Sequence, residues 1–241
     1  MAIYTSKTRI DLEDVGYSNK ITNKAILKIL ENAGARQSET IHFGLNDMEN
    51  VGFSWILLGW KVKILKRPIY NEELTINTWG RDSNRIFTYR DYEIYDESGE
   101  LCAIATSKWA IVDINTGKLR ELTPEIIEKY QCETKKVFEE DYTLKLKEPV
   151  TIIRKQEYKA QRRDIDINKH IHNLYYLDYA YEVLPEEVYE APECNNIEIM
   201  YKKQIRLNDE FKCLYTKEEN QNIVTMKSKD ENTLHAIIKL Y

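Results

Sequence analysis

Cysteine is scarce and scattered in this sequence. The four thiols, Cys102, Cys132, Cys194 and Cys213, lie far apart and form no C-x-x-C pair. Four scattered cysteines without a C-x-x-C pair fit reduced thiols better than a disulfide framework or a zinc site. We expect reduced thiols in a reducing compartment and assign these residues no role.

Long apolar runs and an excess of basic residues are also lacking. No stretch reaches the ~18 apolar residues that span a bilayer, and the beginning of the sequence holds no apolar signal core. The 35 Lys and Arg residues face 40 Asp and Glu residues, and this net charge of -5 argues against a general nucleic-acid-binding protein. We expect a cytoplasmic protein that binds neither nucleic acid nor membrane.

A G-x-S-x-G motif is absent as well, which argues against a serine hydrolase of the α/β type. Histidine is rare: His42 and His235 are isolated, and we interpret His172 as a polar residue of a first helical turn. What the chain does have is 42% apolar and 11% aromatic residues, enough for a core. The protein is globular, with one large domain or two of about 120 residues.

Hydrophobic periodicity predicts an α+β organisation that occurs twice. In the first half, a helix begins at Thr22 or Asn23 and is bent or capped at Gly34. Strands are expected at residues 4–12, 51–66, 74–76, 87–95 and 101–114, with a short helix at 125–130. In the second half, a strand at 151–167 and a helix at 173–184 precede strands at 197–207, 210–217, 222–228 and 234–241.

The two halves can be aligned residue against residue. Asp14–Asn23 matches Asp164–Asn173 at a spacing of 150 residues, and Asn71–Ile76 matches Asn208–Cys213. A helix followed by an antiparallel sheet that wraps around it is the hotdog arrangement, and two copies in one chain pair as a fused dimer. We therefore predict an α+β tandem hotdog, with copies at residues 1–130 and 150–241 and a charged surface linker at 131–149.

One segment, residues 161–174, places polar side chains at every second position before a helix. Asp166, Asn168 and His170 are spaced so that an extended chain puts a carboxylate, an amide and an imidazole on one face. We predict Asn173 as the N-cap, with free backbone N–H groups directed at the same place, where an oxyanion could form. The same residue types also cap turns, so a purely structural role is the alternative interpretation.

Residues 162–175 resemble the signature of the acyl-acyl carrier protein (acyl-ACP) thioesterases, in the bacterial branch related to plant plastid enzymes. Further similar segments follow in the family's order, at residues 55–58, 106–109, 115–119, 122–125 and 200–203. The resemblance implies a tandem hotdog that hydrolyses the acyl thioester on the carrier's phosphopantetheine and so ends fatty acid synthesis, without metal or cofactor. It also implies that Asp166, Asn168 and His170 are catalytic.

The sequence departs from the plant enzymes at one position of this site. Those relatives carry Glu and then Cys after a Tyr-Arg-Arg motif, whereas Tyr201–Lys203 is followed here by Gln204 and Ile205. Gln204 can align a water molecule but cannot take its proton, so the base role falls on Asp166, alone or shared with His170. Whether Asp166 activates water or attacks to form an anhydride stays open.

Acyl carrier proteins are acidic, and residues 151–170 hold six basic against three acidic residues in a chain of net negative charge. We predict a carrier-docking patch of Lys155, Lys159, Arg162 and Arg163. A solvated basic face without a partner is the alternative. A monomer and a homodimer both remain open.

The first copy has lost the polar triplet, because Gly16, Ser18 and Lys20 stand at the matching positions. We predict one active site per chain and an acyl-chain pocket in the first copy. The predicted pocket residues, with an ordinary core role as the alternative, are Ile26, Ile29, Leu30, Ala33, Trp55, Leu57 and Trp109. Two other functions remain open: an acyl-CoA thioesterase of the same fold, and an acyl-binding hotdog protein without activity.

Overall fold

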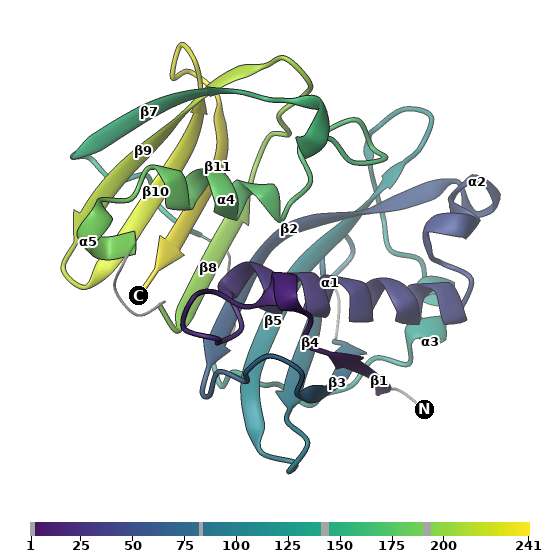
Figure 1. Cartoon of the computed structure of the whole chain (residues 1–241). Helices are drawn as coiled ribbons and strands as arrows, with labels where there is room; N and C mark the ends of the chain where they lie inside the picture. Colours follow the sequence, from purple (N-terminus) through teal and green to yellow (C-terminus); the bar gives the residue numbers. More distant parts are fainter. Residues whose placement is uncertain (1–2, 82–83, 141–144, 190–193) are drawn as a thin grey trace. The chain divides into compact units, whose positions relative to one another are not determined.

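Figure 1 shows a computed structural model of the chain, which describes residues 3–81, 84–140, 145–189 and 194–241. The chain forms two compact units, residues 1–143 and residues 144–241, called here the first and the second unit. Each unit packs a helix on an antiparallel sheet, as the sequence predicts for a hotdog. Within the described ranges, no helix combines the length and the apolar character needed to cross a membrane.

The sheet of the first unit has the strand order β1-β3-β4-β5-β2, with β6 paired to β5, and all of these pairs are antiparallel. Helix α1 lies across one face of this sheet (Figure 1). The strands are β1 (Tyr4–Arg9), β2 (Phe53–Ile64), β3 (Glu73–Gly80), β4 (Thr88–Tyr95), β5 (Leu101–Asp113) and β6 (Leu119–Arg120). The helices are α1 (Asn23–Thr40), α2 (Met48–Val51) and α3 (Pro124–Tyr130), with 3-10 turns at Leu12–Asp14 and Leu45–Asp47.

Helix α1 begins where the sequence predicts and continues through its glycine. The Thr22 hydroxyl accepts the Ala25 N–H at 3.2 Å and so caps the first turn. The predicted bend or cap at Gly34 is wrong, because the helix is continuous over 18 residues. Gly34 instead permits a close approach: a Cβ there would stand 2.9 Å from the Tyr92 hydroxyl and 3.2 Å from Cδ of Arg90.

Strand β2 keeps its large side chains on the helix side by means of a β-bulge. Its register against β5 shifts between Leu57 and Gly59, which leaves Leu58 as the extra residue. In a regular strand, with Leu58 as an ordinary position, Trp60 would be three residues after Leu57 and would point to the opposite face, because side chains alternate along a strand. Trp60 is fully buried, and its ring lies 5.4 Å from that of Tyr92, which faces α1.

The predicted linker, residues 131–149, begins as part of the first unit. The Lys135 carbonyl accepts the Trp79 indole N–H at 2.9 Å, and the Val137 N–H donates to the Asp91 carboxylate at 3.0 Å. Trp79 and Asp91 are cross-strand partners that alternate with the residues facing α1, so this segment covers the opposite face of the sheet. Asp91 is completely buried there, and residues 141–144 lie outside the described chain.

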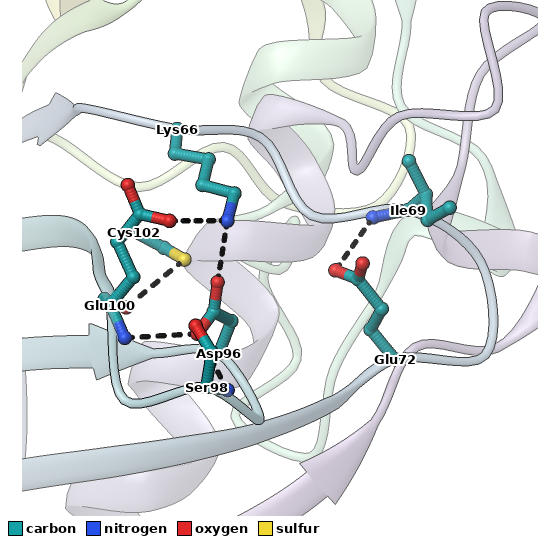
Figure 2. A network of polar contacts seen from close by, with 7 residues as sticks. All are labelled: Lys66, Ile69, Glu72, Asp96, Ser98, Glu100 and Cys102. Carbon is teal, nitrogen blue, oxygen red and sulfur yellow. Dashed lines mark hydrogen bonds and ion pairs between the residues drawn. The ribbon is translucent and has the colours of Figure 1, made fainter.

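A polar network closes the β4–β5 hairpin (Figure 2). Asp96 Oδ1 accepts the N–H groups of Ser98 and Glu100, both at 2.9 Å, and Asp96 Oδ2 lies 2.6 Å from the Lys66 ammonium. The Lys66 ammonium and the Ser98 donor hold the pKa of Asp96 well below its usual range. The tip of the hairpin is thereby tied to the segment that leaves β2.

The second unit repeats this order with a smaller sheet, β8-β11-β10-β9-β7, whose pairs are again antiparallel. Helix α4 lies over one face of it (Figure 1). The strands are β7 (Arg154–Lys159), β8 (Asn196–Tyr201), β9 (Glu210–Glu218), β10 (Gln221–Ser228) and β11 (Leu234–Leu240). The helices are α4 (Tyr175–Glu182) and α5 (Glu186–Tyr189), with a 3-10 turn at Arg162–Asp164.

Two strands of the second unit are shorter than predicted. The strand expected at 151–167 covers only Arg154–Lys159, because the 3-10 turn closed by the buried Asp164 carboxylate interrupts it. The strand expected at 197–207 ends at Tyr201. Beyond it, residues 202–209 cross the ends of β11 and β10 to reach β9; we call them the crossing segment.

Several backbone and carboxylate hydrogen bonds recur at matching positions of the two units. Asp14 and Asp164 each accept the N–H three residues earlier, and each carbonyl accepts the N–H eight residues later, at 2.9 and 2.8 Å. Asn71 and Asn208 both adopt left-handed backbone angles, with φ values of 71° and 70°. These shared contacts confirm the internal repeat and its alignment.

Candidate functional site

The predicted catalytic triplet lies in a tight turn, residues 166–170, and not on one face of an extended segment. The Asp166 N–H donates to the His170 carbonyl at 2.9 Å, and Lys169 has a φ of 64°. The chain reverses because Asp166 Oδ1 accepts the N–H groups of Asn168 at 2.8 Å and of His170 at 3.4 Å. Such local bonds from an Asp side chain compete with extended structure. The prediction of an extended face is wrong, and the structure instead holds the three residues in one tight turn, called here the triplet turn.

The crossing segment holds the triplet turn in place. Ile165 and Ile171 pair at the base of the turn, and the Ile171 N–H donates to the Ile205 carbonyl at 2.8 Å. His170 forms a further antiparallel bridge with Arg206. Because Ile205 is completely buried, this contact fixes the turn to the core of the second unit.

The start of α4 differs from the prediction. The N-cap is Leu174 and not Asn173, and the Leu174 N–H donates to Nδ1 of His172 at 3.3 Å. The N–H groups of the first helical turn are used locally: that of Tyr175 donates to the His172 carbonyl at 2.9 Å, and that of Leu177 to the Leu174 carbonyl at 3.2 Å. They are not available to a substrate, so the predicted oxyanion site at this helix terminus is wrong.

His170 has the electrostatic surroundings of a proton acceptor. Burial lowers the pKa of its imidazole below the usual value; the Asp166 carboxylate opposes this effect and the Arg206 guanidinium adds to it. The imidazole is therefore neutral near pH 7, the form that accepts a proton.

Two primary amides are available beside the triplet turn. The Asn168 and Gln204 side chains are exposed, and neither amide forms a hydrogen bond within the described chain. Gln204 lies in the crossing segment, directly before the buried Ile205, and the crossing segment borders the triplet turn. An amide N–H₂ group can donate to a developing oxyanion.

A polar groove of about 700 Å³ lies along the crossing segment on the second unit. Its lining includes Gln204 and Arg206 of the crossing segment. It also includes Ser228, Lys229, Asp230 and Thr233 at the connection between β10 and β11. His235 also lines this groove; it is only 6% exposed, and its Nδ1 lies 2.8 Å from the Lys203 carbonyl. Burial lowers the pKa of His235.

The residues predicted to line an acyl pocket are spread over α1 and two strands of the first unit. The members that are 8% exposed or less are Ile26, Ile29, Leu30, Ala33 and Leu57. Trp55 and Trp109 are half-buried. The structure pairs Leu57 with Trp109 across β2 and β5, and it packs Trp55 against Tyr130 at 5.6 Å between ring centroids.

The predicted docking residues lie on one edge of the second unit. Lys155 and Lys159 are exposed on the edge strand β7, and Arg162 and Arg163 are exposed on the 3-10 turn that follows. Lys155 has Glu231 at 3.4 Å, and Arg163 has Asp164 at 3.8 Å. Lys159 and Arg162 form no ion pair within the described residues, so they carry the unneutralised positive charge.

Sequence reasoning missed Arg206 and His235. Arg206 lies far from His170 in the chain, and only the structure shows their bridge, whose counterpart in the first unit joins Lys20 and Ile69. His235 carries no motif around it. Only the pairing of β8 with β11 brings it to the crossing segment.

Comparison with known sequences places both units in one family. Residues 1–130 match the acyl-ACP thioesterase N-terminal domain, and residues 147–239 match the C-terminal domain. Oleoyl-acyl carrier protein thioesterase 2 of Arabidopsis thaliana is 25% identical over 238 residues, which cover 92% of this chain and 65% of that protein. The chain thus spans slightly less than two thirds of this plant relative.

Solved structures share the fold over the whole chain. An acyl-ACP thioesterase from Bacteroides thetaiotaomicron has a TM-score of 0.86 at 23% identity, with 99% of this chain and 97% of that chain covered. The 12:0-ACP thioesterase from Umbellularia californica has a TM-score of 0.88 at 16% identity, with 100% and 96% covered. The predicted tandem hotdog is therefore confirmed.

Proposed function

Because the chain belongs to the acyl-ACP thioesterase family, we propose that it hydrolyses the thioester joining a fatty acyl chain to acyl carrier protein. The products are a free fatty acid and the carrier with its thiol restored, and the reaction ends chain elongation in fatty acid synthesis. The observation that carries this proposal is the triplet turn, which holds a carboxylate, an amide and an imidazole of lowered pKa within five residues. Among the described residues, the amide has no hydrogen-bond partner.

The reaction requires a nucleophile, an oxyanion donor and a proton for the leaving sulfur. A water oxygen attacks the carbonyl carbon and the C–S bond breaks, while the Asn168 amide donates to the carbonyl oxygen. His170 takes the proton of that water and passes it to the departing thiolate, which needs little help because thiols are acidic. Asp166 orients His170 and stabilises its charged form.

The alternative route uses Asp166 as the nucleophile. Its carboxylate attacks the carbonyl carbon and the C–S bond breaks, so that the phosphopantetheine arm leaves as a thiolate. Water then hydrolyses the mixed anhydride, and His170 takes the proton of that water and passes it to the thiolate. One Asp166 oxygen already accepts backbone N–H groups, which lowers its reactivity, so we favour the route through water. Gln204 aligns that water from the crossing segment.

In this proposal one unit carries the active site and the other binds the acyl chain. Residues 150–241, in the second unit, carry the active site, and residues 131–149 are the connection that the sequence predicts. Residues 1–130, in the first unit, lack the triplet and bind the acyl chain along α1, β2 and β5.

The proposal extends to partner and location. Lys155, Lys159, Arg162 and Arg163 dock the acidic carrier from the edge of the second unit. We place the protein in the cytoplasm, where the buried thiols of Cys102 and Cys213 remain reduced.

One assay tests the function against its alternatives. Purified protein is given acyl-ACP and acyl-CoA with the same acyl chain, and free thiol is measured over time. We expect higher kcat/KM for acyl-ACP. Preference for acyl-CoA would assign the protein to the acyl-CoA thioesterases, and binding without thiol release from either substrate would identify a non-catalytic acyl-binding protein.

A further inference from the structure

A buried guanidinium lies inside the first unit, beside the proposed acyl site. Arg90 of β4 is 7% exposed, and Tyr92, two residues further along the strand, is completely buried. Both side chains face α1, because a Cβ at Gly34 would stand 3.2 Å from Cδ of Arg90 and 2.9 Å from the Tyr92 hydroxyl. A plain hydrocarbon chain offers no group that pairs with a cation, so binding of such a chain does not account for Arg90.

The groups that contact Arg90 within the described chain are neutral. Its Nη1 donates to Gln37 Oε1 and, at 3.2 Å, to Thr78 Oγ1, and its Cζ lies 5.3 Å from the centroid of the Tyr130 ring. Burial raises the pKa of the Tyr92 and Tyr130 hydroxyls, so both phenols stay uncharged. A buried charge without a counter-ion is unfavourable, and a negative ligand would be stabilised beside it.

No carboxylate of the described chain pairs with Arg90. Asp91, the next residue of β4, points to the opposite face of the sheet, where it lies 3.6 Å from the Arg81 guanidinium. Burial and, to a smaller degree, the charge of Glu31 raise the pKa of Tyr92, but Glu31 forms no ion pair with Arg90. Among the described residues, the buried cation therefore has no counter-ion.

One edge of the guanidinium is unused. Both hydrogen bonds of Arg90 start from Nη1, so its Nε and Nη2 groups donate to no residue of the described chain. Nε–H and one Nη2–H point in parallel from the same edge of the guanidinium plane. An arginine can hold a carboxylate through such an edge, with one hydrogen bond to each oxygen.

The interior beside Arg90 is accessible to a chain-like ligand. Ser107 pairs with Arg90 across β5 and β4, and Trp109 and Thr88 form the next pair on the same face of the sheet. Trp109 and Thr88 are half-buried although they face the α1 side, and Leu57 of β2 lies next to Trp109. Two residues of a strand span about 7 Å, so an aliphatic chain along Leu57 and Trp109 reaches the guanidinium with its far end.

We infer that Arg90 binds a carboxylate at the end of an aliphatic chain inside the first unit. The inference rests on the proposed function, because that function places the aliphatic chain in this unit. Two ligands carry such a group: a dicarboxylic acyl chain, whose second carboxylate lies at the end far from the thioester, and a free fatty acid, the product of the reaction. In either ligand the carboxylate accepts from Nε and Nη2 and supplies the counter-ion.

Gln37→Glu tests the site without removing the arginine. The new carboxylate has the size of the amide and pairs with Arg90 from α1, so the fold is kept while the charge becomes neutralised. Calorimetric titration should show at least about tenfold weaker binding of decanoate and unchanged binding of 1-decanol. Asn77→Asp adds the same charge on the opposite face of β3 and should change neither affinity.

Kinetics distinguish the two ligands. Thioesters of decanoic and decanedioic acid with N-acetylcysteamine have equal chain lengths, and the ratio of their kcat/KM values measures recognition of the second carboxylate. Gln37→Glu and Arg90→Met should lower the ratio of dicarboxylic to plain substrate by about tenfold if the site serves the substrate. Arg81→Met removes an equally buried cation that Asp91 already pairs with, and it should leave the ratio unchanged.

The outcomes separate the inference from the proposed function. A lowered ratio assigns the dicarboxylic acyl chain to Arg90, and weakened decanoate binding without a lowered ratio assigns the free fatty acid. Unchanged decanoate affinity together with an unchanged ratio in Gln37→Glu would overturn the inference, while cleavage of acyl-ACP by the wild-type protein still upholds the proposed function. Failure to cleave either thioester or acyl-ACP would overturn the proposed function, and the decanoate titration would still test Arg90.

Discussion

Asp14 and Asp164 hold the same buried position in the two units, and each carboxylate closes the 3-10 turn that leads into a tight turn. They accept the N–H groups of Asp11 at 3.2 Å and of Gln161 at 2.7 Å. Only the second of these tight turns carries the polar triplet. The first unit thus keeps the carboxylate that supports the turn and lacks the polar triplet, so the backbone of the turn does not depend on the triplet side chains.

The Asp164 carboxylate, which supports the triplet turn, is expected to contribute to the stability of the fold. Asp164→Ala should lower the free energy of unfolding by about 1–3 kcal/mol, because the Gln161 N–H and the Tyr179 hydroxyl, which donates to Asp164 at 2.6 Å, lose their acceptor. Urea denaturation measures this change. Glu13→Ala, at a side chain that is 80% exposed, is the control and should shift stability by less than about 0.5 kcal/mol. The double variant Asp164→Ala/Tyr179→Phe tests whether the two side chains are coupled. Its loss of unfolding free energy should be smaller than the sum of the losses in the two single variants.

The catalytic assignment is tested by substitutions at matching positions of the two units. Asp166→Ala, Asn168→Ala and His170→Ala should each lower kcat on acyl-ACP by on the order of 10² or more, because each group acts on the reacting atoms. Ser18→Ala and Lys20→Ala occupy the equivalent turn of the first unit and should leave kcat within about twofold.

Wild-type turnover in Asp166→Ala would remove this residue from the mechanism. Far-ultraviolet circular dichroism must show that each variant is folded, since Asp166 also caps its own turn.

The pH dependence should respond to Arg206. The pKa of His170 is lowered by burial and by the Arg206 charge, against the opposing effect of Asp166. Activity that needs the neutral imidazole falls as pH drops through this lowered pKa. Removal of the positive charge in Arg206→Gln makes protonation easier, so the pKa rises and the acid limb of kcat/KM moves to higher pH.

A nuclear magnetic resonance titration of the His170 ring gives the same pKa without any substrate. Arg162→Gln removes an exposed cation from the 3-10 turn and serves as the control. If the acid limb of the pH profile of kcat/KM stays in place or moves to lower pH in Arg206→Gln, the assignment of His170 as proton acceptor is contradicted.

Much of the site could be predicted because its residues are adjacent in sequence. The alternation of polar residues before a predicted helix pointed to Asp166, Asn168 and His170. The lost triplet of the first half followed from the alignment of Asp14 with Asp164. The shape of the turn could not be predicted, because the Asp166 carboxylate binds backbone N–H groups that an extended strand would direct elsewhere. The start of α4 was missed for a similar reason, since His172 replaces Asn173 as the local acceptor.

Features that depend on distant partners were beyond sequence reasoning. Arg206 reaches His170 only through a bridge between segments that are far apart in the chain. The bulge at Leu58 could not be predicted, because the neighbouring residues are also apolar and their pattern does not show which face of the strand is buried. Residues 131–138 have a charged composition, which is typical of a linker. In the structure, however, their backbone forms hydrogen bonds with the side chains of Trp79 and Asp91 on the sheet, and composition does not predict such contacts.

Carrier docking should depend on salt through the unneutralised cations. The KM for acyl-ACP should rise steeply with ionic strength and further in Lys159→Gln, whereas the KM for a small acyl thioester should stay flat. Lys7→Gln, on the matching edge strand β1, removes a charge that Glu73 already neutralises at 2.7 Å and is the control. Equal salt dependence for both substrates would place docking elsewhere.

Chain-length selection should respond to the first unit and not to the second. Ala33 on α1 and Val183 at the end of α4 are equivalent in the repeat, and both are almost completely buried. Ala33→Phe adds volume beside the proposed acyl site, so products should shift toward shorter chains, because each buried CH₂ contributes roughly 0.8 kcal/mol only where it fits. Val183→Phe overpacks the second unit to a similar degree and should lower stability without changing the product profile.

The profile of free fatty acids released from a mixture of acyl-ACP chain lengths gives the readout, and it is independent of the total amount of folded enzyme. A loss of stability common to both variants cannot alter the ratio of products, so only a steric limit on the acyl chain moves it. An unchanged profile in Ala33→Phe, or a shift confined to Val183→Phe, would show that the acyl chain is bound outside the first unit.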